Sequence, residues 1–364
     1  MTRISARLFL ALIAVLAILE SGCGKFFSNS NGGGGGGGNS TTTFVYAASS
    51  SGVFAYKADL TAGTLTTLAG SPFGTSIAPP VAMVIDPNNK FLYVGSSTGI
   101  NGFAINSDGT LNTIGLSLNA QLTPAALAAS ASTLYVLDNS FNTLSALTIN
   151  SNGTLTTPSG NTAVQVTGLP SGLVIDPAGQ HLYAALGSTG ILTVNINSDG
   201  SLTANSSNIV TPSSTAVSFN DLAITPNGKS MYATANGGVV AFSFNTNGIP
   251  TPLSNGAVVT TGTNPSAATV DSSSSFLYVT NRGSDSVASF SITNSGLITP
   301  ITNSPFATGS APVGVAVNSK NTFVFVANSR GVQTFAVDSS TPGKLNAKAT
   351  VNAGNNPAAV VALH

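Results

Sequence analysis

The sequence predicts an all-β fold, a seven-bladed β-propeller with four antiparallel strands per blade, because two unrelated features each repeat seven times. An aromatic residue recurs in short apolar runs at spacings of 47, 42, 48, 49, 46 and 47 residues. These aromatic residues are Tyr46, Tyr93, Tyr135, Tyr183, Tyr232, Tyr278 and Phe325. A glycine turn follows each run, at TAGT (61), SDGT (107), SNGT (151), SDGS (198), TNGI (246), NSGL (294) and TPGK (341). Periods of about 40 to 50 residues with several short strands are typical of propeller blades.

One unit shows how four strands arise from each repeat. The apolar run VAMVI (81–85) ends in the turn DPNNK, and the aromatic strand FLYVGS (91–96) follows. A polar loop leads to a third strand, GFAIN (102–106), and the glycine turn leads to a fourth strand near LNTIGL (111–116). Asp-Gly and Asn-Gly turns supply the positive φ angles that tight hairpins need.

The two ends of the repeated region complement each other. The region starts near Phe44 with an aromatic strand that lacks a first strand, and it ends with PAAVVAL (357–363), a first strand without a successor. Joining them completes the seventh blade and closes the ring, which leaves no open sheet edge. A solenoid is the alternative architecture, but it favours atypical capping units at both ends.

Residues 1–22 are expected to be a signal peptide. Arg3 and Arg7 precede an apolar run of 12 residues at positions 8–19, too short to span a bilayer. Ser21, Gly22 and Cys23 resemble the cleavage site of a bacterial lipoprotein, in which the cysteine takes a lipid, whereas Glu20 departs from the apolar residue usual there. The alternative is an ordinary secreted protein with an incidental cysteine.

Residues 23–43 are expected to form a lipid anchor at Cys23 and a flexible tether. Cys23 is the only cysteine, so no intrachain disulfide can form. Seven consecutive glycines follow, and such a segment buries no apolar surface. The sequence therefore predicts a propeller over 44–364, exported to the bacterial cell envelope and held at a membrane through its lipid alone.

Most of the charges fall on one face of the predicted disc. The turns after strands one and three lie on this face, here called the turn face, and they hold the turn aspartates Asp59, Asp86, Asp108, Asp176, Asp199, Asp271 and Asp338. Aspartate at such positions commonly accepts hydrogen bonds from the N–H groups of its own turn. We therefore expect these side chains to be structural.

The opposite face, here called the mouth face, carries the loops after strand two and the connections between blades. It holds the candidate ligand-binding residues Arg282, Arg330, Asp138, Asp221 and Asp285. Arg282 and Arg330 are the only arginines after residue 22, and they lie in equivalent loops of neighbouring blades. Two guanidinium groups so placed can clamp a carboxylate or a phosphate. The alternative is a local pairing, for instance of Arg282 with Asp285.

Residues 278–281 read Tyr-Val-Thr-Asn, and with the seven repeats they carry a family resemblance. The stretch 44–364 resembles the YVTN-repeat and lactonase-type seven-bladed propellers, whose best-known enzymes are similar to 6-phosphogluconolactonase. The resemblance implies a lactone-hydrolysing site built from His, Glu and Arg around the channel mouth. This chain has no Glu after residue 22, and His181 stands beside a turn on the opposite face.

These gaps favour a non-catalytic binding or scaffolding module, with a sugar lactonase as the alternative. The first strands begin PVA, PAA, PSG, FND, PSA, PVG and PAA, so only Asn220–Asp221 is strongly polar at the channel. No catalytic residue, cofactor or metal site is predicted. With 6% charged residues and a net charge of zero, a nucleic-acid partner is not expected. The expected partner is an envelope protein or a small anionic ligand, bound by a monomer.

Overall fold

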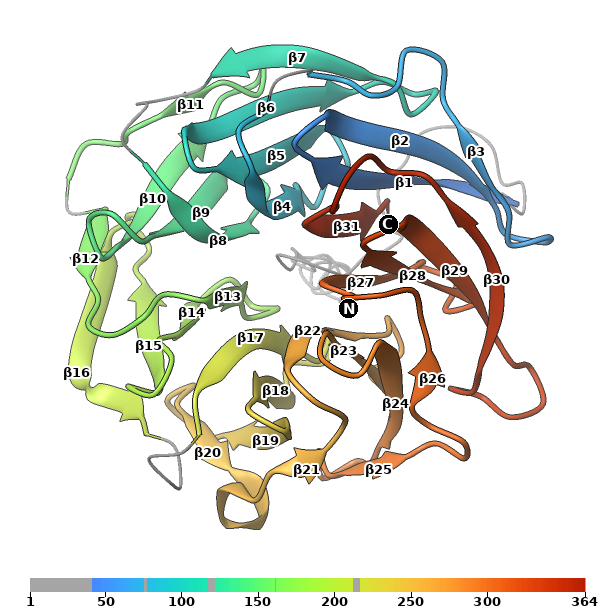
Figure 1. Ribbon diagram of the computed structural model, residues 1–364. Coiled ribbons are helices and arrows are strands. Elements are labelled where there is room, and N and C mark those ends of the chain that lie inside the picture. The colour runs from blue at the N-terminus through green and yellow to red at the C-terminus, as the bar shows by residue number, and fades with distance from the viewer. Residues whose placement is uncertain (1–40, 75–76, 117–121, 161, 212–216, 364) are drawn as a thin grey trace, which may run out of the picture.

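The computed structural model describes residues 41–363 apart from 75–76, 117–121, 161 and 212–216. Seven antiparallel sheets form a closed ring around a central channel, as Figure 1 shows. This confirms the predicted seven-bladed propeller. The predicted signal peptide and most of the predicted tether lie outside the described residues. Within the described chain, no helix is long and apolar enough to cross a membrane.

We number the blades along the chain and give their strands from the channel outward. Blade 1 contains β31 (Ala359–Ala362), β1 (Thr42–Ser49), β2 (Gly52–Asp59) and β3 (Leu65–Thr67). Blade 2 contains β4 (Pro80–Ile85), β5 (Phe91–Ser96), β6 (Gly99–Ile105) and β7 (Leu111–Leu116). Blade 3 contains β8 (Pro124–Ala129), β9 (Thr133–Asp138), β10 (Thr143–Ile149), β11 (Leu155–Thr156) and β12 (Ala163–Gln165). Blade 4 contains β13 (Gly172–Ile175), β14 (His181–Ala185), β15 (Ile191–Ile196) and β16 (Leu202–Val210).

The remaining three blades complete the ring. Blade 5 contains β17 (Phe219–Ile224), β18 (Ser230–Ala235), β19 (Gly238–Phe244), β20 (Pro250–Pro252) and β21 (Val259–Thr260), with a 3-10 turn at Leu253–Gly256. Blade 6 contains β22 (Pro265–Val270), β23 (Phe276–Asn281), β24 (Ser286–Ile292), β25 (Ile298–Pro300) and β26 (Phe306–Ala307). Blade 7 contains β27 (Gly314–Val317), β28 (Phe323–Asn328), β29 (Gly331–Val337) and β30 (Leu345–Val351). In blades 3, 5 and 6 the outer strand is broken into two pieces that both pair with the third strand.

The last strand closes the ring as predicted. β31 pairs antiparallel with β1, with Val45 opposite Ala362 and Ala48 opposite Ala359. Blade 1 is therefore built from both ends of the described chain. Because β1 starts and β31 ends beside the turns of blade 1, both described ends leave the ring on the turn face.

The turns between the first and second strands explain the positions of Asp86, Asp176 and Asp271. Asp86 Oδ1 accepts the N–H groups of Lys90 and Phe91 at 2.7 and 2.6 Å. Asp176 and Asp271 make the equivalent bonds in blades 4 and 6. Asn318 makes them in blade 7, so a neutral amide serves as well as a carboxylate. Burial raises the pKa of Asp86 against the opposing effect of these hydrogen bonds.

The exposed turns after the third strands use aspartate in a similar way. Asp59, Asp108, Asp199 and Asp338 accept N–H groups two or three residues further on. Hydrogen bonds to the charged form lower the pKa of each of these carboxyl groups. The expectation that the turn aspartates are structural is confirmed for these seven positions.

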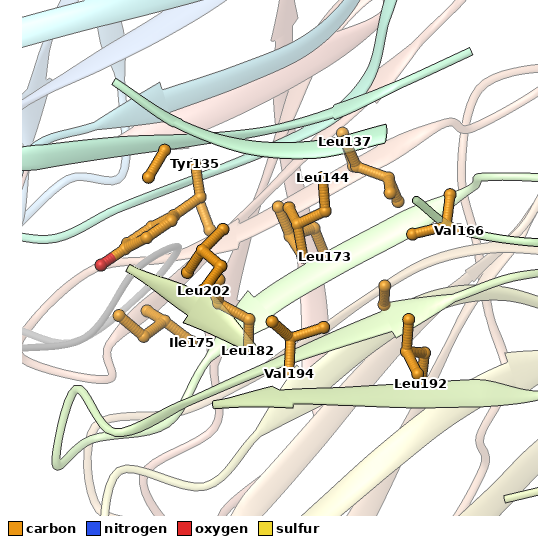
Figure 2. Close-up of a cluster of buried hydrophobic side chains, with 14 of the residues drawn as sticks. Tyr135, Leu137, Leu144, Val166, Leu173, Ile175, Leu182, Leu192, Val194 and Leu202 are labelled. Atoms are coloured by element: carbon orange, nitrogen blue, oxygen red, sulfur yellow. The ribbon is translucent and has the colours of Figure 1, made fainter. Parts of the chain in front are cut away.

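The apolar core consists of seven clusters, one between each pair of neighbouring blades. Figure 2 shows the cluster between blades 3 and 4, where Leu137 and Leu144 face Leu173, Leu182 and Leu192. Alternate residues of each strand point to opposite faces of a sheet, so both faces of every blade contribute to the core. Closing the ring thus leaves each of these faces covered.

The repeated tyrosines join neighbouring blades through their hydroxyl groups. Four of them reach the glycine turn of the following blade and donate to the glycine carbonyl oxygen, at 2.8 to 3.0 Å. These bonds join Tyr46 to Gly109, Tyr93 to Gly153, Tyr183 to Gly248 and Tyr232 to Gly296. The residue two positions before each of these tyrosines packs on the same glycine, as the ring of Phe44 does on Gly109. A Cβ at these glycines would collide with that side chain, so this bond and this contact explain the repeated glycine.

Three blade junctions depart from this pattern. The Tyr135 hydroxyl lies within reach of the Thr133 and Ser130 side chains of its own blade. Phe325 has no hydroxyl. At the junction of blades 6 and 7, Ser289 Oγ donates to Gly343 O at 2.6 Å, and the buried Tyr278 hydroxyl has no hydrogen-bond partner.

Candidate functional site

The central channel opens on the mouth face into a cavity of about 130 Å³. It is lined by the first residues of the innermost strands, which come from all seven blades. Each innermost strand is paired on one edge only, so alternate N–H groups of its free edge point toward the channel. The site therefore combines side chains at the strand starts with a set of backbone donors.

Seven equivalent residues surround the opening and are called the mouth ring. They are Val81, Ala125, Ser171, Asn220, Ser266, Val313 and Ala358. In blades 2, 3, 5 and 6 the pairing of the first two strands shifts register at this residue, which marks a β-bulge. A bulge turns a side chain away from the regular pleat. In these four blades the residue at the bulge lines the cavity.

The residue after each mouth-ring residue is small in six blades and charged in one. These residues are Ala82, Ala126, Gly172, Asp221, Ala267, Gly314 and Ala359. Asp221 is 8% exposed, and its Oδ2 accepts the N–H of Ala268 in the next blade at 3.1 Å. The fully buried Thr234 holds the backbone of Asp221: its Oγ1 accepts the Asp221 N–H at 2.9 Å and donates to Asp221 O at 3.4 Å. The carboxylate is thus held rigidly in the channel wall.

The polar members of the mouth ring link neighbouring blades. Ser171 Oγ donates to Phe219 O at 3.0 Å, and Ser266 Oγ donates to Pro312 O at 2.8 Å. Asn220 Nδ2 makes a longer bond of 3.4 Å to Pro265 O. In each case the acceptor immediately precedes the mouth-ring residue of the next blade. The three side chains therefore have a structural role, and the three residues also line the cavity.

The two arginines lie outside the cavity lining. Arg282 and Arg330 are exposed on the mouth face. Their backbone N–H groups hold the loops: that of Arg282 donates to Asn264 O, and that of Arg330 donates to Asn328 Oδ1. Within the described chain Arg282 makes no ion pair with Asp285, so the alternative of a local pairing is not what the structure shows.

The other two candidate aspartates hold loops on the mouth face. Asp138 is fully buried and accepts the N–H groups of Thr123 and Phe141 at 2.6 and 2.9 Å. Asp285 Oδ1 accepts the Ala311 N–H at 2.8 Å, and its φ of 48° lies in the left-handed region. Neither lines the cavity, and the structure brings neither of them together with Asp221 there.

His181 lies on the turn face, as its strand position predicts. Its ring packs on Gly248 of the next blade, and Nδ1 is 2.9 Å from Asp176 Oδ2. No group of three or more His, Cys, Asp or Glu side chains that could hold a metal ion occurs among the described residues. The sequence already contained the signal for the site, because FND was the one polar strand start. The bulge at this start was not visible in it.

Comparisons with known proteins find the same seven-bladed propeller fold. The family model described as "Lactonase, 7-bladed beta-propeller" matches residues 38–362. A 6-phosphogluconolactonase candidate from Bacteroides fragilis is 19% identical, with a TM-score of 0.76 over 89% of this chain and 99% of the other. The periplasmic gluconolactonase of Pseudomonas aeruginosa is 20% identical, with a TM-score of 0.73 over 89% and 99%. No curated protein matches the sequence. At these identities the solved structures establish the fold alone.

Proposed function

Because the chain belongs to the family of seven-bladed β-propeller lactonases, we propose that it hydrolyses a lactone at the channel mouth with Asp221 as general base. One observation carries the proposal. Six of seven equivalent positions hold Ala or Gly, and the seventh holds a carboxylate that faces the cavity. A lone acidic residue in an otherwise small and apolar ring is not required by the repeat, because the other six blades form without it.

The chemistry needs a base and a group that stabilises negative charge. Asp221 takes a proton from a water molecule as the water oxygen attacks the lactone carbonyl carbon. Backbone N–H groups on the free strand edges hydrogen-bond the carbonyl oxygen as it becomes negative. The ring C–O bond then breaks, and Asp221 returns the proton to the leaving ring oxygen. The product is an open-chain hydroxy acid, and no cofactor is needed.

A non-catalytic binding module is the second candidate, and the hydrogen bonds of the channel wall favour it. Ser171, Ser266 and Asp221 all bond backbone groups of the next blade, which by itself accounts for their presence. No arginine lines the cavity opposite the carboxylate. In this alternative the protein is a scaffold that binds an envelope protein or a small anionic ligand. The family match supports the lactonase proposal better.

Substitution of Asp221 by asparagine separates the two candidates. Asn keeps the shape and an acceptor for the Ala268 N–H but cannot take a proton. We expect kcat/KM for a hydrolysed lactone to fall by a factor of about 100 to 10,000, the usual contribution of a general base, with an unchanged melting temperature. Asp138→Asn is the matched control, a buried aspartate on the same face outside the cavity, and it should leave kcat/KM unchanged. Equal rates for wild type and Asp221→Asn would favour the binding module.

Arg282 and Arg330 remain our proposed site for an anionic group on the mouth face. Both are exposed on equivalent loops of blades 6 and 7. If they share one ligand, each Arg→Ala change should weaken its binding by about 1.5–3 kcal/mol, and the two effects should not add. Calorimetry with small carboxylates and sugar phosphates tests this, since equal binding to the double variant would exclude the site.

We further propose that the protein is exported and lipid-anchored at Cys23. The apolar run at 8–19 and the residues Ser21-Gly22-Cys23 support this, and the described chain starts on the turn face, away from the cavity. Cys23→Ala should move the protein to the soluble envelope fraction with an intact fold. Complete partition of the wild type into the aqueous phase of a detergent separation would rule out the anchor.

A further inference from the structure

The mouth ring is not symmetric, and its polar and apolar members are separated. Going round the channel, blades 4, 5 and 6 contribute Ser171, Asn220 and Ser266, which we call the polar arc. Blades 7, 1, 2 and 3 contribute Val313, Ala358, Val81 and Ala125, which we call the apolar arc. Asp221 belongs to blade 5, the middle blade of the polar arc. The opening therefore has one hydrogen-bonding side, which carries the carboxylate, and one hydrocarbon side.

The apolar arc borders the core of the ring. Met83, Val315 and Val360 lie two residues further along the strands of the same arc and also line the cavity, with side chains that pack between neighbouring blades. No Lys, Arg or His lines the cavity, and its one charged lining residue is Asp221. A phosphate or carboxylate group entering here would lose its hydration beside another negative charge, which is unfavourable. A hydrocarbon group would leave water for an apolar wall, which is favourable.

Size and exposure indicate how a ligand would lie. The cavity, about 130 Å³, is small beside the 300–1,000 Å³ usual for pockets that enclose a drug-sized ligand. A small ring can enter, and any longer substituent has to pass the opening. Val81 stands there with 51% of its surface exposed, in the centre of the apolar arc. Four large apolar side chains are exposed in the described chain, and of these Val81 lines the cavity, whereas Phe141, Leu169 and Leu297 do not.

We propose that the site takes a lactone that carries an aliphatic substituent rather than a phosphorylated or fully hydroxylated sugar lactone. The ester group of the ring lies against the polar arc beside Asp221, and the aliphatic chain lies along the apolar arc and leaves past Val81. This assignment of the substrate class rests on the proposed lactone hydrolysis. The separation of the two arcs carries it, because a polyhydroxylated ring would place hydroxyl groups against four blades that offer no side-chain partner.

Binding and hydrolysis are measured in parallel so that the two proposals can fail separately. Five- and six-membered lactams bearing alkyl chains of zero to six carbons serve as analogues that resist hydrolysis, and calorimetry gives their Kd. The lactones of the same series, gluconolactone and 6-phosphogluconolactone are tested for hydrolysis. We expect Kd to fall about three- to fourfold for each of the first added methylenes. We expect kcat/KM to rise along the alkyl series and to exceed that of both sugar lactones.

Val81→Asn is the decisive variant, and Leu297→Asn is its matched control. Asn220 shows that the bulge position accepts asparagine, so Val81→Asn should fold. Leu297 is an apolar residue of the turn face with a similar exposure of 42%. We expect Val81→Asn to reduce the gain per methylene to less than twofold, and Leu297→Asn to leave it unchanged.

Each outcome decides one of the two proposals. Hydrolysis that is independent of chain length, or fastest on 6-phosphogluconolactone, would overturn the assignment of an aliphatic substrate and leave the lactonase proposal standing. Chain-dependent lactam binding without hydrolysis of any lactone would support the apolar arc as a binding wall and overturn the lactonase proposal. No binding of any lactam would overturn the assignment, as would a chain dependence that Val81→Asn leaves intact.

Discussion

On the two faces of the ring, equivalent positions of the seven blades differ in how far their side chains repeat. On the turn face, side chains repeat from blade to blade, and each bonds its own turn or the next blade, as Asp86 and Tyr46 do. On the mouth face, equivalent positions carry different side chains, such as Val81, Ser171 and Asn220. Repetition thus accompanies the contacts that build the ring, and variation accompanies the surface that faces a ligand.

The difference between the faces also indicates whether a departure from the repeat affects stability or function. Phe325 and Ser289 interrupt the tyrosine pattern near the turn face. Phe325 has no hydroxyl to donate, and Ser289 bonds Gly343 O in place of Tyr278, whose hydroxyl is left without a partner among the described residues. Asp221 interrupts the small-residue ring near the mouth, and it places a charge in a cavity. The first kind of departure should alter stability alone, whereas the second should alter function alone.

Removing the closing strand should have the largest effect. Deletion of residues 355–364 exposes the edge of β1 and uncovers the apolar clusters that contain Val360 and Val361. The loss should be comparable with the whole stability of a domain, about 5–15 kcal/mol, so we expect aggregation or no cooperative thermal transition. A truncated protein that melts like the full-length protein in calorimetry would contradict the closed ring.

Loss of one bond between blades should have a smaller, measurable effect on stability. Tyr46→Phe removes the hydroxyl that donates to Gly109 O in a buried site and leaves that carbonyl without this partner. We expect a loss of about 1–3 kcal/mol in urea unfolding, with unchanged ligand binding. Burial raises the pKa of Tyr46, so the bond should persist through the whole neutral range. A change in lactone hydrolysis without a change in stability would contradict the division between the faces.

Exchanging the serine bond between blades 6 and 7 for a tyrosine bond should stabilise the protein. In blade 1, Ala55 lies opposite Tyr46, and the tyrosine bond forms. In blade 6 the equivalent residue is Ser289, which occupies Gly343 O and leaves the Tyr278 hydroxyl without a partner. Ser289→Ala should let Tyr278 bond Gly343, and we expect a gain of about 1 kcal/mol in unfolding free energy. A destabilisation of the same size would show that the serine bond is the better of the two.

The smallest effect is expected at a turn aspartate. Asp86→Asn should keep the bonds from Lys90 and Phe91, as Asn318 keeps its two, but lose the bond from the Asn88 N–H to Oδ2. Because that loss offsets part of the gain, we expect a stabilisation at pH 7 of about 1 kcal/mol or less. Burial raises the pKa of folded Asp86, so its charged form is disfavoured on folding. That cost is absent below the unfolded pKa and complete above the raised folded pKa, so the gain should vanish near about pH 3. A gain that persists at low pH would point to another cause.

The turn face could be predicted from the sequence because its chemistry is local. The spacing of Tyr46 to Phe325 and the glycine turns gave seven blades, and turn aspartates such as Asp86 were expected to bond their own turns. The broken outer strands of blades 3, 5 and 6 were not expected, since those segments carry no repeated signal. The hydroxyl bonds of the tyrosines were missed because they join residues about 63 positions apart, as in Tyr46 and Gly109.

Only part of the mouth face could be predicted from the sequence. The polar start Asn220–Asp221 was recognised, and the lactonase resemblance is now a family membership. The division into a polar and an apolar arc depends on the order of blades around the ring and on bulges at the strand starts. Neither is a property of any single repeat. The sequence-based preference for a scaffold relied on the missing Glu and on the place of His181 beside a turn of the other face, and the family match now supports the lactonase alternative better.

We expect lactone recognition to take place at the channel mouth around Asp221, and neither on the turn face nor at the separate anion site proposed for Arg282 and Arg330. A crystal structure with an alkyl lactam bound tests this most directly. We predict that the lactam ring lies in the cavity within hydrogen-bond distance of Asp221 or of the channel-edge N–H groups, with its chain against Val81. A lactam found on the turn face, or on the loops of Arg282 and Arg330 with an empty channel, would contradict the claim.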